Sequence, residues 1–184
     1  MGSRGNFLSF LAGNKPAKRS DISVASIVAK IQRMGHEYQP GNASKPGYLY
    51  SPLPFPEFKD TPYQRRAVAE RCFLLSHSLP RPFTKQRKLL DIGCHTGYNC
   101  FRFQELGYEC TGLESDELTI EIAQDVSELK QTGIKFINAK VGIESLKQLG
   151  KFDIVLFLST FQWVVQLCSY ETIVRAASVE PAQF

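Results

Sequence analysis

One stretch constrains the fold of this chain more than any other: residues 88–99, which read KLLDIGCHTGYN. Leu89, Leu90 and Ile92 form a short apolar run that is typical of a buried parallel strand. Gly93 and Gly97 then bracket a tight loop. The stretch therefore predicts a strand that runs into a glycine-bracketed turn.

A helix should follow this turn over residues 99–106 and end at Gly107, a favourable residue just beyond a helix C-terminus. Glycines allow the backbone to approach a ligand closely, and a helix N-terminus offers free N–H groups and a positive dipole to an anion. The strand, turn and helix together indicate a ligand site. The simpler alternative is an ordinary strand-to-helix turn whose glycines serve only its geometry.

Three further strands are expected after this turn. They cover residues 108–113, 134–137 and 152–158, and the last is the most hydrophobic. Strands that alternate with helices predict right-handed parallel crossovers. The fold class is therefore α/β, a Rossmann-like, doubly wound and mostly parallel sheet with additional N-terminal helices.

The helix between the second and third strands should be amphipathic. Ser115 is its expected cap, and Gly133 its expected end. Its apolar stripe is formed by Leu118, Ile122, Val126 and Leu129. Three acidic residues are expected to face water: Glu121, Asp125 and Glu128.

The pattern Asp91-Ile92-Gly93-x-His95-x-Gly97 resembles the first motif of the class I S-adenosylmethionine (SAM)-dependent methyltransferases, with His95 where the middle glycine usually stands. Glu114 follows the second strand about 20 residues later, and FDIV at the start of the fourth strand is also similar to the family. A nicotinamide-type G-x-G-x-x-G would need glycine at positions 95 and 98, so it fits less well.

The resemblance covers about residues 88–163 and implies the strand order 3-2-1-4. It also implies SAM as cofactor, with the residues Asp91, Gly93, Cys94, His95, Gly97, Glu114, Ser115, Asn138 and Ser159 around it. In the family's arrangement, Asp91 and the loop hold the methionine part, with Asp91 facing the ammonium group. Glu114 binds the ribose hydroxyls.

The same resemblance places other residues near the adenine and the methyl group. Leu113 or Ser115 flanks the adenine, and Asn138 or Lys140 lies near its amino group. Ser159 follows the fourth strand, on the side of the methyl group and the acceptor. No catalytic base is identified, and no metal site is indicated.

His95 has two interpretations. In the functional interpretation, the imidazole acts on the ligand, as a proton acceptor or as a lid over the methionine part. In the structural interpretation, this position merely tolerates a side chain that points out of the loop.

Residues 1–60 should form an N-terminal unit and residues 61–184 a partial methyltransferase domain. The N-terminal unit contains a basic arm, an amphipathic helix capped by Ser20 or Asp21, and a proline-rich connector. The helix should lie either over the mouth of the cofactor site or against the sheet. A second helix should follow a cap at Asp60 or Thr61, with Pro62 at its first position.

The charge of +4 comes from the N-terminal part, where six basic and two acidic residues precede position 41. Solvated charge is the commoner explanation, and a nucleic-acid partner is the weaker alternative. No apolar run approaches the roughly 20 residues of a membrane span. Five cysteines without a C-x-x-C pair indicate reduced thiols in a cytoplasmic protein.

The sequence supports a SAM-dependent methyltransferase, possibly in truncated form, that acts on an unidentified acceptor. A SAM- or nucleotide-binding module without catalysis and a NAD(P)-dependent oxidoreductase are the alternatives. The strands that complete the family's sheet are missing, so the apolar fourth strand should form an open edge. Such an edge predicts self-association.

Overall fold

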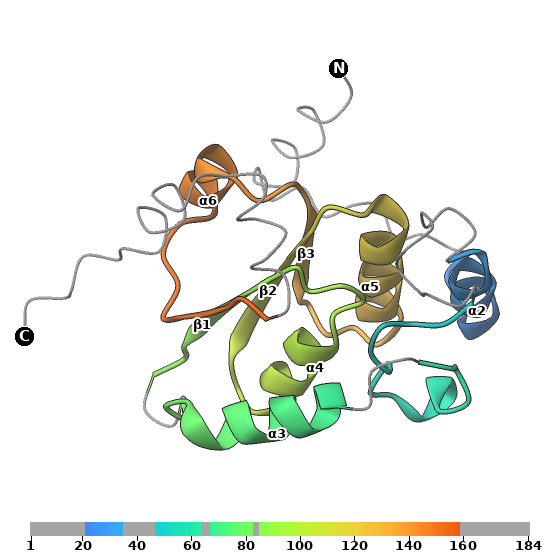
Figure 1. Cartoon of the computed structure of the whole chain (residues 1–184), viewed down its shortest axis with the longest axis horizontal. Coiled ribbons are helices and arrows are strands. Elements are labelled where there is room, and N and C mark those ends of the chain that lie inside the picture. The colour runs from blue at the N-terminus through green and yellow to red at the C-terminus, as the bar shows by residue number, and fades with distance from the viewer. Residues whose placement is uncertain (1–20, 35–46, 64–66, 83–84, 159–184) are drawn as a thin grey trace, which may run out of the picture.

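The computed structural model describes residues 21–34, 47–63, 67–82 and 85–158 (Figure 1). Four strands form the centre: β1 (Lys88–Ile92), β2 (Glu109–Glu114), β3 (Lys135–Asn138) and β4 (Ile154–Leu156). The helices are α2 (Val24–Arg33), α3 (Ala67–Ser78), α4 (Tyr98–Glu105), α5 (Glu117–Leu129) and α6 (Ile143–Leu149), with a 3₁₀ turn, η1, at Pro56–Phe58. None of the described helices is both long and apolar enough to cross a bilayer.

The sheet confirms the predicted α/β fold. Its strand order is β3-β2-β1-β4, and every neighbouring pair is parallel. Because all four strands point the same way, their carboxyl ends meet at one edge. This edge carries the glycine loop after β1 and Glu114 at the end of β2.

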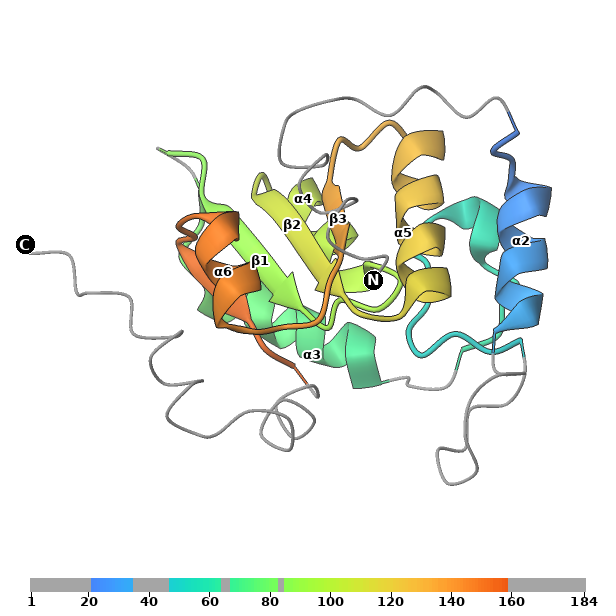
Figure 2. The ribbon, with the colours of Figure 1, turned by 90° about the horizontal axis from the view of Figure 1, so that it is seen from above.

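Helices cover both faces of the sheet, and the alternation of side chains along β1 divides the core between them. Leu89 packs into a large cluster with residues of α4, α5 and the N-terminal segments. Leu90 and Ile92 face the other way, into a smaller cluster flanked by Leu146 and Leu149 of α6. Figure 2 shows α6 and α5 on different sides of the strands.

Strand β4 is shorter than expected, Ile154–Leu156 in place of residues 152–158. It pairs with β1 over Leu89, Leu90 and Asp91. Val155 is 49% exposed. Among the described residues β4 has β1 as its one strand partner, and self-association through this edge stays a prediction.

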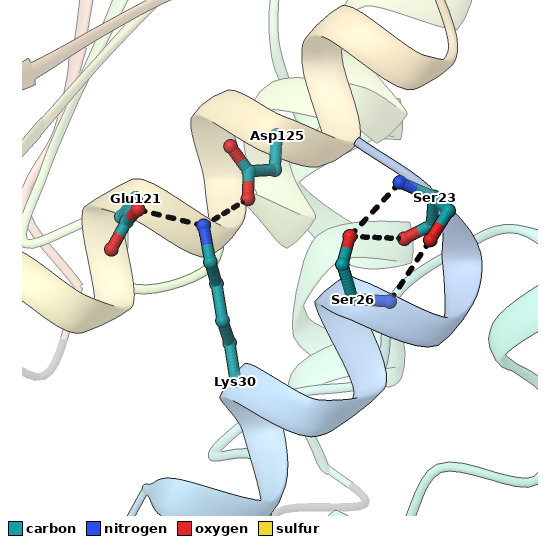
Figure 3. A network of polar contacts seen from close by, with 5 residues as sticks. All are labelled: Ser23, Ser26, Lys30, Glu121 and Asp125. Carbon is teal, nitrogen blue, oxygen red and sulfur yellow. Dashed lines mark hydrogen bonds and ion pairs between the residues drawn. The ribbon is translucent and has the colours of Figure 1, made fainter. Parts of the chain in front are cut away.

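Helix α2 begins two or three residues later than expected, because its cap is Ser23 and not Asp21 or Ser20. Ser23 Oγ accepts a hydrogen bond from the Ser26 backbone N–H at 3.1 Å, and Ser26 Oγ accepts one from the Ser23 N–H at 2.9 Å. This reciprocal capping box satisfies two backbone donors at once and is visible in Figure 3.

Helix α2 packs against the outer side of α5, and not over the cofactor edge or directly on the sheet (Figure 2). Its buried residues are Ile27 and Ile31. The helix therefore adds a third layer on the α5 side of the sheet.

A lysine joins these two helices. Lys30 Nζ donates a hydrogen bond to Glu121 Oε1 at 2.7 Å and another to Asp125 Oδ2 (Figure 3). Asp125 is only 2% exposed, so its predicted exposure to water is wrong. Burial alone would lower the pKa of Lys30, but the hydrogen bonds to the two carboxylates outweigh it and raise that pKa.

The expected ends of two further helices also need correction. Asp116 caps α5 in place of Ser115, since its Oδ1 accepts from the Thr119 N–H at 2.8 Å, and α5 ends at Leu129, before Gly133. Helix α3 is described from Ala67, and the predicted start at Pro62 is wrong because Tyr63 forms a β-bridge with Leu49.

Replacing Lys30 with methionine should leave Asp125 buried without its cation. We expect Lys30→Met to lower the free energy of unfolding by roughly 2–3 kcal/mol, below the full cost of breaking a completely buried pair. Because folding raises the pKa of Lys30, the stabilisation by this ion pair is fully present below about pH 10.5, the pKa of an ordinary lysine. The stabilisation is lost as the pH rises through the folded-state pKa. Urea denaturation at pH 7 measures the loss.

The matched control is Arg102→Gln. Arg102 pairs with Glu105 at 2.5 Å, but both side chains are 47% exposed, so its removal should cost less than about 1 kcal/mol. Equal losses in the two variants would show that the Lys30 pair adds nothing beyond a surface ion pair.

Candidate functional site

The loop after β1 is bent back against the end of β2. Gly93 and Gly97 have positive φ angles of 72° and 86°, and His95 adopts the same left-handed region at 52°. The backbone N–H groups of Gly93 and Cys94 both donate to the Leu113 carbonyl oxygen, at 2.8 and 3.2 Å. The loop is therefore fixed to β2, and α4 begins directly after Gly97.

Asp91 lies at the base of this loop, 1% exposed. Asn99 Nδ2 donates a hydrogen bond to Asp91 Oδ2 at 3.4 Å, the one hydrogen bond to this carboxylate from a side chain in the described residues. Burial raises the pKa of Asp91 to about 7, against the lowering effect of Asn99 and with a smaller contribution from Glu114. A buried carboxylate held in this way is suited to a cationic ligand group.

Glu114 is at the end of the neighbouring strand, and backbone donors fix its carboxylate. Oε2 accepts from the His95 N–H at 3.1 Å, and Oε1 accepts from the N–H groups of Ser115 and Asp116 at 2.7 and 3.1 Å. Oε2 retains a lone pair, because a carboxylate oxygen accepts more than one hydrogen bond. It can therefore receive a ligand hydroxyl.

Two of the predicted adenine-side residues lie beside Glu114. Asn138 is its partner in the β2–β3 register, and Asn138 Nδ2 donates to the Ser115 carbonyl oxygen at 3.4 Å. The fold thus brings Glu114, Ser115 and Asn138 to one place. Ser159, the predicted residue on the methyl-group side, lies outside the described residues.

A small pocket opens at Asp91. The predicted residues Asp91, Gly93, Cys94 and His95 line it together with residues that sequence reasoning did not assign to the cofactor: Tyr50, Ser51, Val68, Arg71, Tyr98, Asn99 and Leu158. Tyr50 and Ser51 come from the connector, and Arg71 comes from α3. They precede the motif by 20 residues or more in the sequence, and no spacing rule links them to it.

His95 contributes its ring to the wall of this pocket. The ring centroid lies 5.7 Å from that of Tyr50, and Nδ1 is 3.3 Å from Thr96 Oγ1. Burial lowers the pKa of the imidazole, although Glu114 and Asp116 oppose this effect. The side chain is therefore packed between the loop and the connector, and does not simply extend from the loop.

Two glycines allow the loop, β2 and β3 to come this close. A Cβ at Gly97 would lie 2.5 Å from the Phe136 ring, and one at Gly112 would lie 2.6 Å from the same ring and 2.7 Å from Cys94 Sγ. These distances are shorter than real carbon contacts. The Phe136 side chain thus fills the space that side chains at these two positions would need.

Gly97→Ala should destabilise the protein by roughly 2–4 kcal/mol, since it combines an unfavourable left-handed backbone with overpacking. Gly142→Ala is the control, because a Cβ there meets no atom within 4 Å and φ is −172°. That change should stay within about 1 kcal/mol. Urea denaturation compares the two, and similar stabilities would contradict the close packing around Gly97.

Comparison with known proteins finds similarity to methyltransferases. Residues 89–178 match the family described as "Methyltransferase domain". The ubiquinone biosynthesis O-methyltransferase of Brucella anthropi is 34% identical over 89 residues, which are 48% of this chain and 35% of that protein. The enzyme of the same name from Ruegeria pomeroyi is 29% identical over 147 residues, 79% of this chain and 55% of that protein. The chain thus spans between about a third and just over half of these relatives.

Solved structures support the fold. A crystal structure of WbdD, described in a second structure as a bifunctional kinase-methyltransferase, has a TM-score of 0.62 and 19% identity. The match covers 84% of this chain and 32% of WbdD. At this identity the likeness concerns the fold alone. Residues 89–178 thus match the methyltransferase-domain family, and the strand order 3-2-1-4 of the described sheet agrees with the fold that this match implies.

Proposed function

We propose that this protein binds SAM at the carboxyl ends of β1 and β2 and transfers its methyl group to an acceptor. One observation carries the proposal. The buried carboxylate of Asp91 and the backbone-fixed carboxylate of Glu114 lie on adjacent strand ends, joined by the glycine loop. SAM carries an ammonium group at one end and a ribose diol in its middle, so the two carboxylates match two separate parts of it.

In this proposal Asp91 binds the ammonium group of the methionine part. Arg71 lines the same pocket and supplies a cation for the methionine carboxylate. Glu114 accepts hydrogen bonds from the ribose hydroxyls, while Ser115 and Asn138 border the adenine. Gly93, Cys94, His95 and Gly97 form the loop over which the cofactor passes.

The sulfonium of SAM supplies an activated methyl group when the cofactor is bound. The chain's own residues have to orient the cofactor, align the acceptor and exclude water. The two curated relatives are O-methyltransferases by name, so an oxygen nucleophile is the first acceptor class to test. A hydroxyl acceptor would need a general base.

Two other observations agree with this proposal. The family match favours a methyltransferase over a nicotinamide-dependent oxidoreductase. The described cysteines Cys72, Cys94, Cys100 and Cys110 are buried free thiols, which suits a reducing compartment such as the cytoplasm. A SAM-binding module without catalysis would share the same cofactor residues and would differ in showing no methyl transfer.

Glu114→Ala should weaken binding of the product S-adenosylhomocysteine (SAH) by about 10- to 150-fold. This corresponds to the roughly 1.5–3 kcal/mol contributed by a charge-assisted hydrogen bond. Isothermal titration calorimetry measures the affinity.

Glu109→Ala is the matched control for this experiment, because Glu109 is an exposed carboxylate at the opposite end of the same strand. It should leave the affinity for SAH within about twofold, as expected for a charge away from the ligand. Unchanged affinity in Glu114→Ala would refute the assignment of the ribose to this carboxylate.

The raised pKa of Asp91 predicts how binding depends on pH. The ammonium group needs an ionised carboxylate, so SAH affinity should be level above pH 7 and fall by up to about tenfold per unit below it. Asp91→Asn should bind more weakly at pH 8 and show a flatter profile between pH 6 and 8. A wild-type profile that is already flat over this range would argue against contact between Asp91 and the ammonium group.

A further inference from the structure

We propose that His95 determines how strongly the site distinguishes SAM from its product SAH: an uncharged imidazole admits the positively charged cofactor, and a protonated one favours the neutral product. This inference rests on the proposed function. It concerns the position at which this chain departs from the family's glycine pattern.

The location of His95 provides the first support. It lines the same pocket as Asp91 and Asn99, and its imidazole contacts the Tyr50 ring and the Thr96 hydroxyl. The backbone N–H of His95 is fixed to Glu114. A charge on this ring would therefore be held near the ligand and could not move freely into solvent.

Charged and titratable groups lie near His95, at the end of β2 and in the lining of the pocket. Glu114 and Asp116 favour the protonated ring, and Arg71 lines the pocket as a cation. The remaining titratable groups that line the pocket are Tyr50, Asp91, Cys94 and Tyr98. Burial has the largest effect on His95 and lowers its pKa. Burial therefore favours the uncharged imidazole, and protonation of the ring requires a lower pH than for an exposed histidine.

The two ligands differ by one methyl group and one charge. SAM is a sulfonium cation, whereas the sulfur of SAH is a neutral thioether. A positive charge on His95 repels the sulfonium and leaves the thioether nearly unaffected. For two charges in one partly buried pocket, this repulsion should change the ratio of the affinities by roughly three- to tenfold.

Calorimetry of SAM and SAH between pH 5.5 and 8.5 tests the inference, with the ratio Kd(SAM)/Kd(SAH) as the readout. We expect this ratio to rise roughly three- to tenfold in the wild type as the pH falls from 8.5 to 5.5. Protonation of Asp91 weakens the binding of both ligands, because both carry the ammonium group. Most of the effect of Asp91 therefore cancels in the ratio.

His95→Asn is the matched variant. Asparagine is uncharged and tolerates the left-handed backbone found at this position. The ratio Kd(SAM)/Kd(SAH) of this variant should therefore change by less than about twofold over the same pH range. His95→Gly, which relaxes the backbone further, serves as a second variant with the same expected result.

The two proposals fail in different ways. If neither SAM nor SAH binds the wild type, the proposed function is overturned, and this inference falls with it. If both ligands bind but the ratio is independent of pH, or varies equally in wild type and His95→Asn, the inference alone is overturned. A purely structural role for His95 would shift both affinities together and leave the ratio unchanged.

Discussion

The structure depends on the close approach of the loop after β1 to the end of β2. Gly93 and Cys94 donate to one carbonyl of β2, and His95 donates to the Glu114 carboxylate. This approach requires glycine at positions 97 and 112, where the Phe136 ring leaves no room for a Cβ. The loop, the start of α4 and the two carboxylates of the site therefore have fixed positions relative to one another.

The two carboxylates are held in opposite ways. Asp91 is buried with a single amide donor from a side chain, and its pKa is raised to about 7. Glu114 accepts several hydrogen bonds from backbone N–H groups that cannot move away. The first environment favours a cationic partner, and the second presents a preorganised acceptor to hydroxyl groups. A site with both is more specific than a glycine loop alone.

The segments before β1 belong to the same structure as the sheet. Helix α2 is joined to α5 through Lys30 and its two carboxylates, while Tyr50 and Arg71 reach the pocket at Asp91. Lys30, Tyr50 and Arg71 all precede the matched range, which begins at position 89. Part of the candidate cofactor site is therefore supplied by the N-terminal part of the chain.

The sequence by itself determined the elements of the sheet and the central site residues. The apolar runs predicted the strands β1 and β2, and the edge where they end was predicted from Gly93, Gly97 and Glu114. Hydrophobic periodicity, a glycine loop and an acidic residue at a strand end are all patterns within a short stretch of sequence, so they can be recognised without the fold. Only the tertiary structure decided that Asp125 is buried, that β4 is short, and that Tyr50 and Arg71 line the pocket. Each of these depends on which distant segment covers a residue, and periodicity within one element does not contain that information.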